Sequence, residues 1–221
     1  MTVTEEPQVR GIVVACTTDP ATFDGAADLR SVRVQARPGK AEIDPLLDEC
    51  DHLIVSGSDA DLAAVVARIM RRDRLSGVSV GYVPASPGSA VAAIWGLPTA
   101  PADALAVALR TDAAPVPLIR DDSGGVLVGR GAFGSVRGEA YCDEHLAFRG
   151  AARSVEVTPS RDGLTARVVA GSLLKRTTTW HGRAFQLGGV SVRPTCDGVE
   201  HPRAVNRWTW YRHTEDLRLA H

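Results

Sequence analysis

The fold class is decided by the stretch Asp51-His-Leu-Ile-Val-Ser-Gly-Ser-Asp-Ala-Asp61, in which a short apolar run leads into small and acidic residues. The arrangement recurs where Val78-Ser-Val-Gly-Tyr-Val83 leads into Pro84-Ala-Ser-Pro-Gly-Ser-Ala90. An alanine-rich helical pattern follows each turn, which predicts strand, turn, helix, strand, turn, helix. In an open parallel sheet such turns line the carboxyl edge, where ligands bind. Small residues there let a phosphate approach the amino-terminus of the following helix.

The composition is that of an ordinary globular protein. The chain has 221 residues, of which 44% are hydrophobic and 23% charged. No apolar run approaches the roughly 20 residues of a membrane span. Residues 1–7 are polar and acidic, unlike a signal peptide, so we expect a cytoplasmic protein. Four widely spaced cysteines are expected to be buried free thiols.

The first half of the chain alternates strand and helix patterns after a polar lead-in at residues 1–8. Expected strands span residues 9–16, 29–36, 52–55 and 78–83, and expected helices span 43–50, 59–72, 89–95 and 102–109. The first of these helices has Pro45, which is expected in its first turn. Arginines gather at the end of the helix at 59–72, where the macrodipole favours cations.

The period of the pattern changes after residue 115. Apolar or alternating segments lie at 116–119, 126–130, 154–158, 164–169, 185–192 and 207–211, separated by Gly- and Asp-rich turns. This is typical of antiparallel sheets. We therefore expect a three-layer α/β domain over residues 1–114 and an antiparallel β-sandwich over 115–221. Trp208 and Trp210 are expected on one strand face, in the core or at a domain interface, with lipid contact as an alternative. His145 with its acidic neighbours is expected in an exposed loop.

Charge is unevenly distributed. Residues 1–134 carry 12 Lys and Arg against 17 Asp and Glu, whereas residues 135–221 carry 13 against 9, and 12 of those 13 cations are arginine. A solvated sheet face explains this excess. Arginine forks also suit phosphates and lipid headgroups, so an anionic membrane surface remains an alternative partner. Nothing in the pattern indicates nucleic-acid binding.

The order of these elements resembles the diacylglycerol kinase catalytic domain, within the superfamily that includes sphingosine and NAD kinases. Its first signature is G-G-D-G-T followed by a helix that begins with leucine. With Leu62 aligned on that leucine, the five positions are Gly57, Ser58, Asp59, Ala60 and Asp61. The resemblance implies that this turn binds ATP phosphates and that Asp59 is a catalytic carboxylate linked to Mg²⁺.

Two further signatures of the family lie later in the chain. The pattern P-x-G-T-x-N-D-x-A, continued by G-x-P, falls on residues 84–92 and 96–98. It implies cofactor contacts at Ser86, Gly88 and Ser89. A D-G-E turn late in the sandwich falls on Asp197-Gly198-Val199, which implies a catalytic and metal-linked role for Asp197. A plain hairpin turn explains Asp197, and helix capping explains Asp59, equally well.

The chain departs from the family at several of these positions. Ser58 and Ala60 replace glycines, and Asp61 replaces threonine and adds a negative charge where phosphates would lie. Pro87 removes a backbone donor from the second turn. Near the amino-terminus, Thr17-Thr-Asp-Pro20 stands where the family has an asparagine-proline and a glycine-rich loop.

Three hypotheses follow. The first is a working lipid kinase whose diverged turns still hold ATP and Mg²⁺ and which phosphorylates a lipid hydroxyl weakly, with Asp59 and Asp197 as metal or base carboxylates. The second is a pseudokinase, a binding module for a protein or a lipid. The third is a cleft re-used for another anion, led by the arginines of the sandwich. The oligomeric state and the acceptor are left open by the sequence.

Overall fold

The computed structural model describes residues 11–16, 29–110, 112–171 and 175–221. Over these residues the chain forms two compact units. The first contains the described residues up to Pro87, together with Pro98–Pro115 and Leu217–His221, and the second contains Gly88–Leu97 and Val116–Asp216. The domain boundary was expected between residues 114 and 115, and the chain passes from the first unit to the second between Pro115 and Val116. The excursion of Gly88–Leu97 and the return of the last five residues were not predicted.

A six-stranded sheet forms the centre of the first unit, in the order β2-β1-β3-β4-β17-β5. Strands β1 to β4 and β17 pair in parallel. Every residue of β3 and β4 is buried, as expected of a parallel sheet covered on both faces. The strands are β1 (Gly11–Ala15), β2 (Arg30–Arg33), β3 (His52–Gly57), β4 (Ser79–Pro84), β5 (Ala114–Val116) and β17 (Leu217–Leu219).

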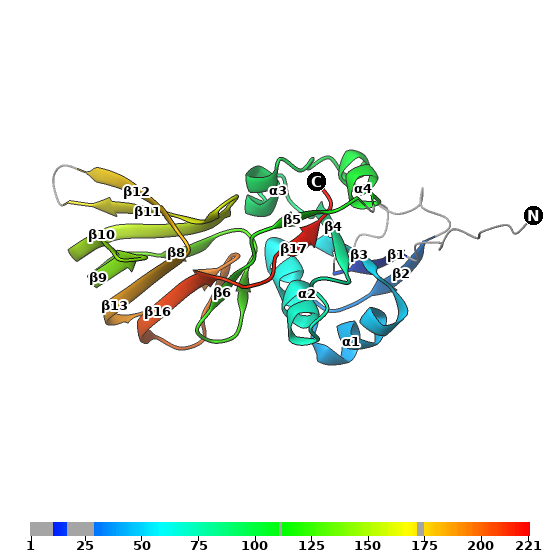
Figure 1. Ribbon diagram of the computed structural model, residues 1–221, viewed down its shortest axis with the longest axis horizontal. Helices are drawn as coiled ribbons and strands as arrows, with labels where there is room; N and C mark the ends of the chain where they lie inside the picture. The colour runs from blue at the N-terminus through cyan, green and yellow to red at the C-terminus, as the bar shows by residue number, and fades with distance from the viewer. Residues whose placement is uncertain (1–10, 17–28, 111, 172–174) are drawn as a thin grey trace, which may run out of the picture. The chain divides into compact units, whose positions relative to one another are not determined.

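Helices cover both faces of this sheet. They are α1 (Lys40–Glu49), α2 (Asp59–Arg71) and α4 (Pro101–Ala108). Helix α4 packs on β4, and its Ala104 and Leu105 form a small core with Val13, Ile54 and Val83. Helix α2 packs on β3 and against α1, and Figure 1 shows these two on the opposite side of the sheet from α4. The predicted three-layer α/β arrangement is confirmed.

Two ion pairs one helical turn apart join α1 to α2. Arg68 forms a two-pronged bond with Asp44, through Nε at 2.8 Å and an Nη atom at 2.9 Å, and both side chains are largely buried. Arg72 bonds the more exposed Asp48 at 2.7 Å. The arginines at the end of α2 therefore serve helix packing, in addition to the expected interaction with the helix dipole.

The second unit is an eleven-stranded antiparallel sheet. Its centre is the long strand β10, which pairs with β8, β9 and β11. The strands are β6 (Ile119–Asp121), β7 (Val126–Leu127), β8 (Gly131–Phe133), β9 (Val136–Cys142), β10 (His145–Ser160), β11 (Gly163–Ala170), β12 (Arg176–Gly182), β13 (Ala184–Val192), β14 (Thr195–Cys196), β15 (Val199–Glu200) and β16 (Val205–Arg212). The short helix α3 (Ala90–Trp95) packs against β10. The predicted antiparallel second half is confirmed.

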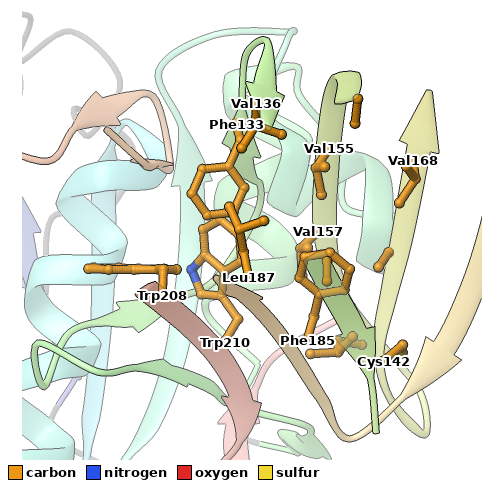
Figure 2. Close-up of a cluster of buried hydrophobic side chains, with 14 of the residues drawn as sticks. Phe133, Val136, Cys142, Val155, Val157, Val168, Phe185, Leu187, Trp208 and Trp210 are labelled. Carbon is orange, nitrogen blue, oxygen red and sulfur yellow. The ribbon is translucent and has the colours of Figure 1, made fainter. Parts of the chain in front are cut away.

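The curled sheet encloses one apolar core (Figure 2). Trp208 and Trp210 are 3% and 0% exposed, which confirms their predicted place in it. The rings of Phe133 and Trp210 lie 4.9 Å apart. Buried residues such as Phe133 and Trp210 alternate with more exposed residues along β8 and β16, so the buried side chains form the inner face of the sheet.

Some sequence predictions were wrong in detail. Helix α1 begins at Lys40, so Pro45 lies beyond its first turn. Residues 116–119 are not one strand: Val116 ends β5 of the six-stranded sheet and Ile119 begins β6 of the antiparallel sheet. His145 is not in a loop, because it begins β10 directly after a tight turn at Asp143. Strands β8, β9, β12, β14, β15 and β17 were not predicted.

Two predictions from composition can be compared with the structure. All four cysteines are free; Cys50 and Cys142 are buried as expected, whereas Cys16 and Cys196 are half-buried. No helix in the described ranges is both long enough and apolar enough to cross a bilayer. The segment at residues 17–20, where the family has its glycine-rich loop, lies outside the described residues.

Candidate functional site

The turn between β3 and α2 is organised by a capping box. Ser58 is the N-cap of α2, and its Oγ accepts a hydrogen bond from the backbone N–H of Asp61 at 3.3 Å. In return the Asp61 carboxylate accepts from the backbone N–H of Ser58 at 2.8 Å. A short polar residue followed three positions later by an acid is the expected sequence for this device. The helix start is therefore set by Ser58 and Asp61.

The carboxylate of Asp61 is almost fully buried and held by three donors. Its Oδ2 accepts from the backbone N–H and the hydroxyl of Ser58, and its Oδ1 accepts from the backbone N–H of Arg37 at 2.6 Å. Arg37 has a φ of 54°, so the loop before α1 takes a left-handed turn to make this contact. The sequence indicated Asp61 as a charge facing incoming phosphates. The structure instead shows a carboxylate bound within the protein.

Asp59 occupies the first position of α2 and is half-buried. Its Oδ1 lies 2.8 Å from the hydroxyl of Tyr82, which also lies 3.1 Å from the carbonyl oxygen of Gly57. Tyr82 is 2% exposed and belongs to β4, the strand beside β3. Asp59 thus lies at the carboxyl end of β3, in the positive field of the helix amino-terminus, and Tyr82 ties it to the sheet.

Gly57 is required by packing at this turn. A Cβ atom on Gly57 would lie 2.7 Å from Asp61 Oδ2 and 3.1 Å from the Cβ of Cys16. Cys16 follows β1, and burial raises the pKa of its thiol to about 12, with smaller contributions from the charges of Asp61 and Glu42. The thiol therefore stays protonated at neutral pH and is no nucleophile. Ala60 is buried in the first turn of α2.

The second turn connects β4 to α3 and is exposed from Ala85 to Gly88. Ser86 and Gly88 therefore lie at the surface, whereas Ser89 is buried and caps α3 by accepting from the backbone N–H of Ala92 at 3.0 Å. Gly96 ends α3 in the left-handed conformation, with a φ of 69°. The residues that matched the second signature at Ser89 and Gly96 thus begin and end a helix.

Asp197 lies in the second unit, in a two-residue turn between β14 and β15. Both Asp197 and Gly198 have positive φ, at 50° and 85°, as the common hairpin turns require. The carboxylate of Asp197 is buried and accepts from the backbone N–H groups of Val128, Gly129 and Arg130 at 2.8–3.1 Å. Of the two interpretations that the sequence left open, this geometry favours the structural one.

The structure brings one group of the predicted residues together within the first unit: Gly57, Ser58, Asp59, Ala60 and Asp61. Ser89 and Asp197 belong to the second unit. Sequence reasoning missed Tyr82 and Arg37. A phenol within a fully buried strand could have indicated Tyr82, because a buried tyrosine hydroxyl usually has a partner. Arg37 acts through its backbone, which leaves no side-chain signal.

Solved structures of other proteins share the fold of this chain. A putative diacylglycerol kinase from Bacillus anthracis str. Sterne superimposes with a TM-score of 0.76 and 12% identity, over 95% of this chain and 96% of that one. An NAD kinase from Archaeoglobus fulgidus in complex with ATP has a TM-score of 0.61 and 10% identity, over 96% and 94%. The chain shares its fold with these kinases. No family model and no curated protein matches it in sequence.

The shared kinase fold raises the question of whether the residues present suit ATP and Mg²⁺. Among the described residues no cluster of three or more His, Cys, Asp and Glu could hold a metal. Mg²⁺ is commonly bound by one or two carboxylates together with substrate phosphates. Asp59 provides one carboxylate at the carboxyl edge of the sheet. The phosphate cradle fits less well, because Asp61 already takes the N–H and the hydroxyl of Ser58.

Proposed function

We propose that this chain is a diacylglycerol-kinase-like protein that binds Mg-ATP at the β3–α2 turn and phosphorylates a lipid hydroxyl slowly. The observation that carries the proposal is Asp59, a half-buried carboxylate at the carboxyl end of β3 and the amino-terminus of α2, held by the hydroxyl of Tyr82. Helix amino-termini at this edge of a parallel sheet suit phosphate groups. The fold shared with solved diacylglycerol kinases supports the choice of reaction.

In this proposal each residue of the turn has a limited part. When bound, Mg-ATP supplies the γ-phosphoryl group and the metal charge that offsets its negative oxygens. Asp59 holds the metal or accepts the proton of the attacking hydroxyl. The amino-terminus of α2 attracts the phosphates through its dipole. Ser58 and Ala60, being small, allow the phosphates to approach the backbone.

The low activity follows from the donors that the turn has lost. Asp61 uses the backbone N–H and the hydroxyl of Ser58, which would otherwise be available to a phosphate. Pro87 has no backbone N–H to offer in the second turn. The carboxylate of Asp197 accepts from three backbone amides, and the proposal gives it no metal role. Phosphate binding then depends on Asp59 through a metal and on the helix dipole.

Isothermal titration with Mg-ATP tests the proposal. We expect saturable heat at millimolar nucleotide that disappears in Asp59→Asn. Label transfer from γ-³²P-ATP to diacylglycerol in mixed micelles should be slow and equally dependent on Asp59. Asp162→Asn, an exposed acid in the β10–β11 turn, serves as the control that leaves both signals unchanged. Absence of heat in the wild-type protein would overturn the proposal.

A non-catalytic binding module is the second candidate function. It is favoured by the internal use of the turn's donors: Asp61 accepts from Ser58 and Arg37, and Asp197 accepts from three amides of the second unit. Both acids then stabilise the fold and need no ligand. This pseudokinase would bind a protein or a lipid surface. Intact folding with no response to nucleotide would select it over the kinase.

The arginines of the second unit suggest which surface to test. An anionic membrane would attract them, with an affinity that falls as salt screens the charges. Co-sedimentation with phosphatidylserine vesicles, compared with phosphatidylcholine vesicles, measures this directly. Preferential binding at physiological salt supports peripheral membrane association, and equal behaviour with both vesicle types removes it. The same result would also remove the hypothesis of an arginine-led anion cleft.

A further inference from the structure

We infer that Tyr82 is a positioning residue that fixes the carboxylate of Asp59. The inference rests on the proposed role of Asp59 in binding Mg-ATP. It concerns a residue outside the sequence motifs, on the strand next to the turn. Tyr82 is among the largest fully buried side chains of the chain, yet its hydroxyl reaches the half-exposed Asp59 at 2.8 Å.

The direction of the phenol follows from the sheet. Successive residues of a strand point to opposite faces. Val83 lies in the core beneath α4, so Tyr82 points to the other face, which α2 covers. In the parallel register Tyr82 lies opposite Val55, two residues before Gly57. The length of the phenol then carries its hydroxyl to the end of β3, where α2 begins.

The chemistry of the contact favours the carboxylate as partner. The hydroxyl has one proton, and both Asp59 Oδ1, at 2.8 Å, and the carbonyl oxygen of Gly57, at 3.1 Å, lie within its reach. A charged acceptor forms the stronger bond. The Gly57 carbonyl already accepts from the backbone N–H of Ala85 at 2.8 Å. It therefore stays satisfied when the tyrosine proton goes to Asp59.

Fixing this side chain has a clear consequence for a metal or phosphate ligand. A carboxylate at the first position of a helix can rotate in solvent, and ordering it on binding costs side-chain entropy. A bond from a buried phenol restricts that rotation before the ligand arrives. The bond to Tyr82 uses one of the roughly four acceptor sites of an ionised carboxylate. Tyr82 thus prepares Asp59 for binding.

A double-mutant cycle separates positioning from simple packing. The variants are Tyr82→Phe, Asp59→Ala and the double variant. Tyr141→Phe is the matched control, because it removes a hydroxyl from an exposed tyrosine on β9. We expect Tyr82→Phe to weaken Mg-ATP binding about tenfold. Tyr141→Phe should leave the affinity unchanged. Because Asp59→Ala is expected to abolish nucleotide binding, the coupling between Tyr82 and Asp59 is measured through unfolding.

Urea unfolding of the same variants keeps this test separate from the proposed function. If the two residues are in contact, the double variant loses less stability than the sum of the single losses. If the unfolding losses are coupled but the wild-type protein does not bind Mg-ATP, the contact between Tyr82 and Asp59 is supported. The proposed function, and with it the positioning role, would then be overturned. Additive unfolding losses would overturn the inference even if Mg-ATP binds. Unchanged affinity in Tyr82→Phe, with binding abolished in Asp59→Ala, would also overturn it.

Discussion

Nε2 of the His52 imidazole lies 2.8 Å from the carbonyl oxygen of Ala108, the last residue of α4. A carbonyl only accepts hydrogen bonds, so Nε2 carries the proton in this contact. On its other side, Nδ1 lies 2.8 Å from the hydroxyl of Ser79 on β4. One buried ring therefore joins α4 to β3 and β4 at the amino end of these two strands.

This histidine should make stability depend on pH. Burial lowers the pKa of His52 below 6.5, against the opposing effects of the Ala108 carbonyl and Asp51. The neutral ring is therefore favoured in the folded state, so stability is complete above the unfolded pKa and falls as pH drops below about 6.5. We therefore expect the urea concentration at the unfolding midpoint to decrease when the pH is lowered from 7.5 to 5.5. Replacement His52→Gln should reduce that fall.

The pKa of His213 is also lowered, by burial and by the nearby charge of Arg120. His213→Gln is therefore the necessary comparison. If it removes as much of the pH dependence as His52→Gln does, the effect does not come from the buried ring. A urea midpoint that rises on acidification would contradict the account altogether.

Gly81 should tolerate no side chain. A Cβ atom there would lie 2.1 Å from the carbonyl oxygen of Ala108, the same atom that His52 contacts. Gly81→Ala must therefore displace α4, and we expect a loss of about 2–3 kcal/mol in unfolding free energy. Gly77→Ala is the matched control, because its nearest neighbour would be 3.8 Å away. Equal losses in the two variants would refute the close approach of α4.

The two ion pairs between α1 and α2 should differ in strength. Arg68→Met removes a two-pronged partner from a largely buried Asp44, whose pKa is held low by the hydrogen bonds and charge of Arg68. We expect a cost of about 2 kcal/mol. Arg72→Met breaks the exposed pair with Asp48 and should cost under about 0.5 kcal/mol. Chemical denaturation at pH 7 measures both, and a reversed order would contradict the burial of Asp44.

Asp197 should affect stability more than ligand binding. Asp197→Asn tolerates the positive φ but loses the charge that three backbone amides share, so we expect a cost of about 1–2 kcal/mol. Titration of the folded variant with Mg-ATP should match the wild-type protein. A large loss of nucleotide affinity with unchanged stability would return Asp197 to the metal-linked role that its family motif implied.

The sequence predicted the layers because local patterns determine them. The apolar runs at β3 and β4 and the period of α2 were sufficient to place a parallel sheet with a turn at its carboxyl edge. Helix capping at this turn was also expected, and the structure shows that Ser58 is the cap. The return of β17 to the first sheet had no such signal, because three residues of strand carry no period of their own.

Roles that depend on side-chain direction could not be predicted. Asp61 was expected to face phosphates, but its burial depends on the backbone N–H of Arg37 in a distant loop. Asp197 matched a motif letter, whereas its partners lie 67–69 residues earlier in the chain. The contact between Tyr82 and Asp59 likewise follows from strand register. Each of these contacts joins segments that only the tertiary fold brings together.

The central claim is that nucleotide phosphates bind where β3 meets α2. Titration of isotope-labelled protein with Mg-ATP, followed through backbone amide chemical shifts, tests it most directly. We predict saturable shifts concentrated at Ser58, Asp59 and Ala60, which are absent in Asp59→Asn. Saturable shifts elsewhere with this turn unmoved, or no shifts at millimolar Mg-ATP, would contradict the claim.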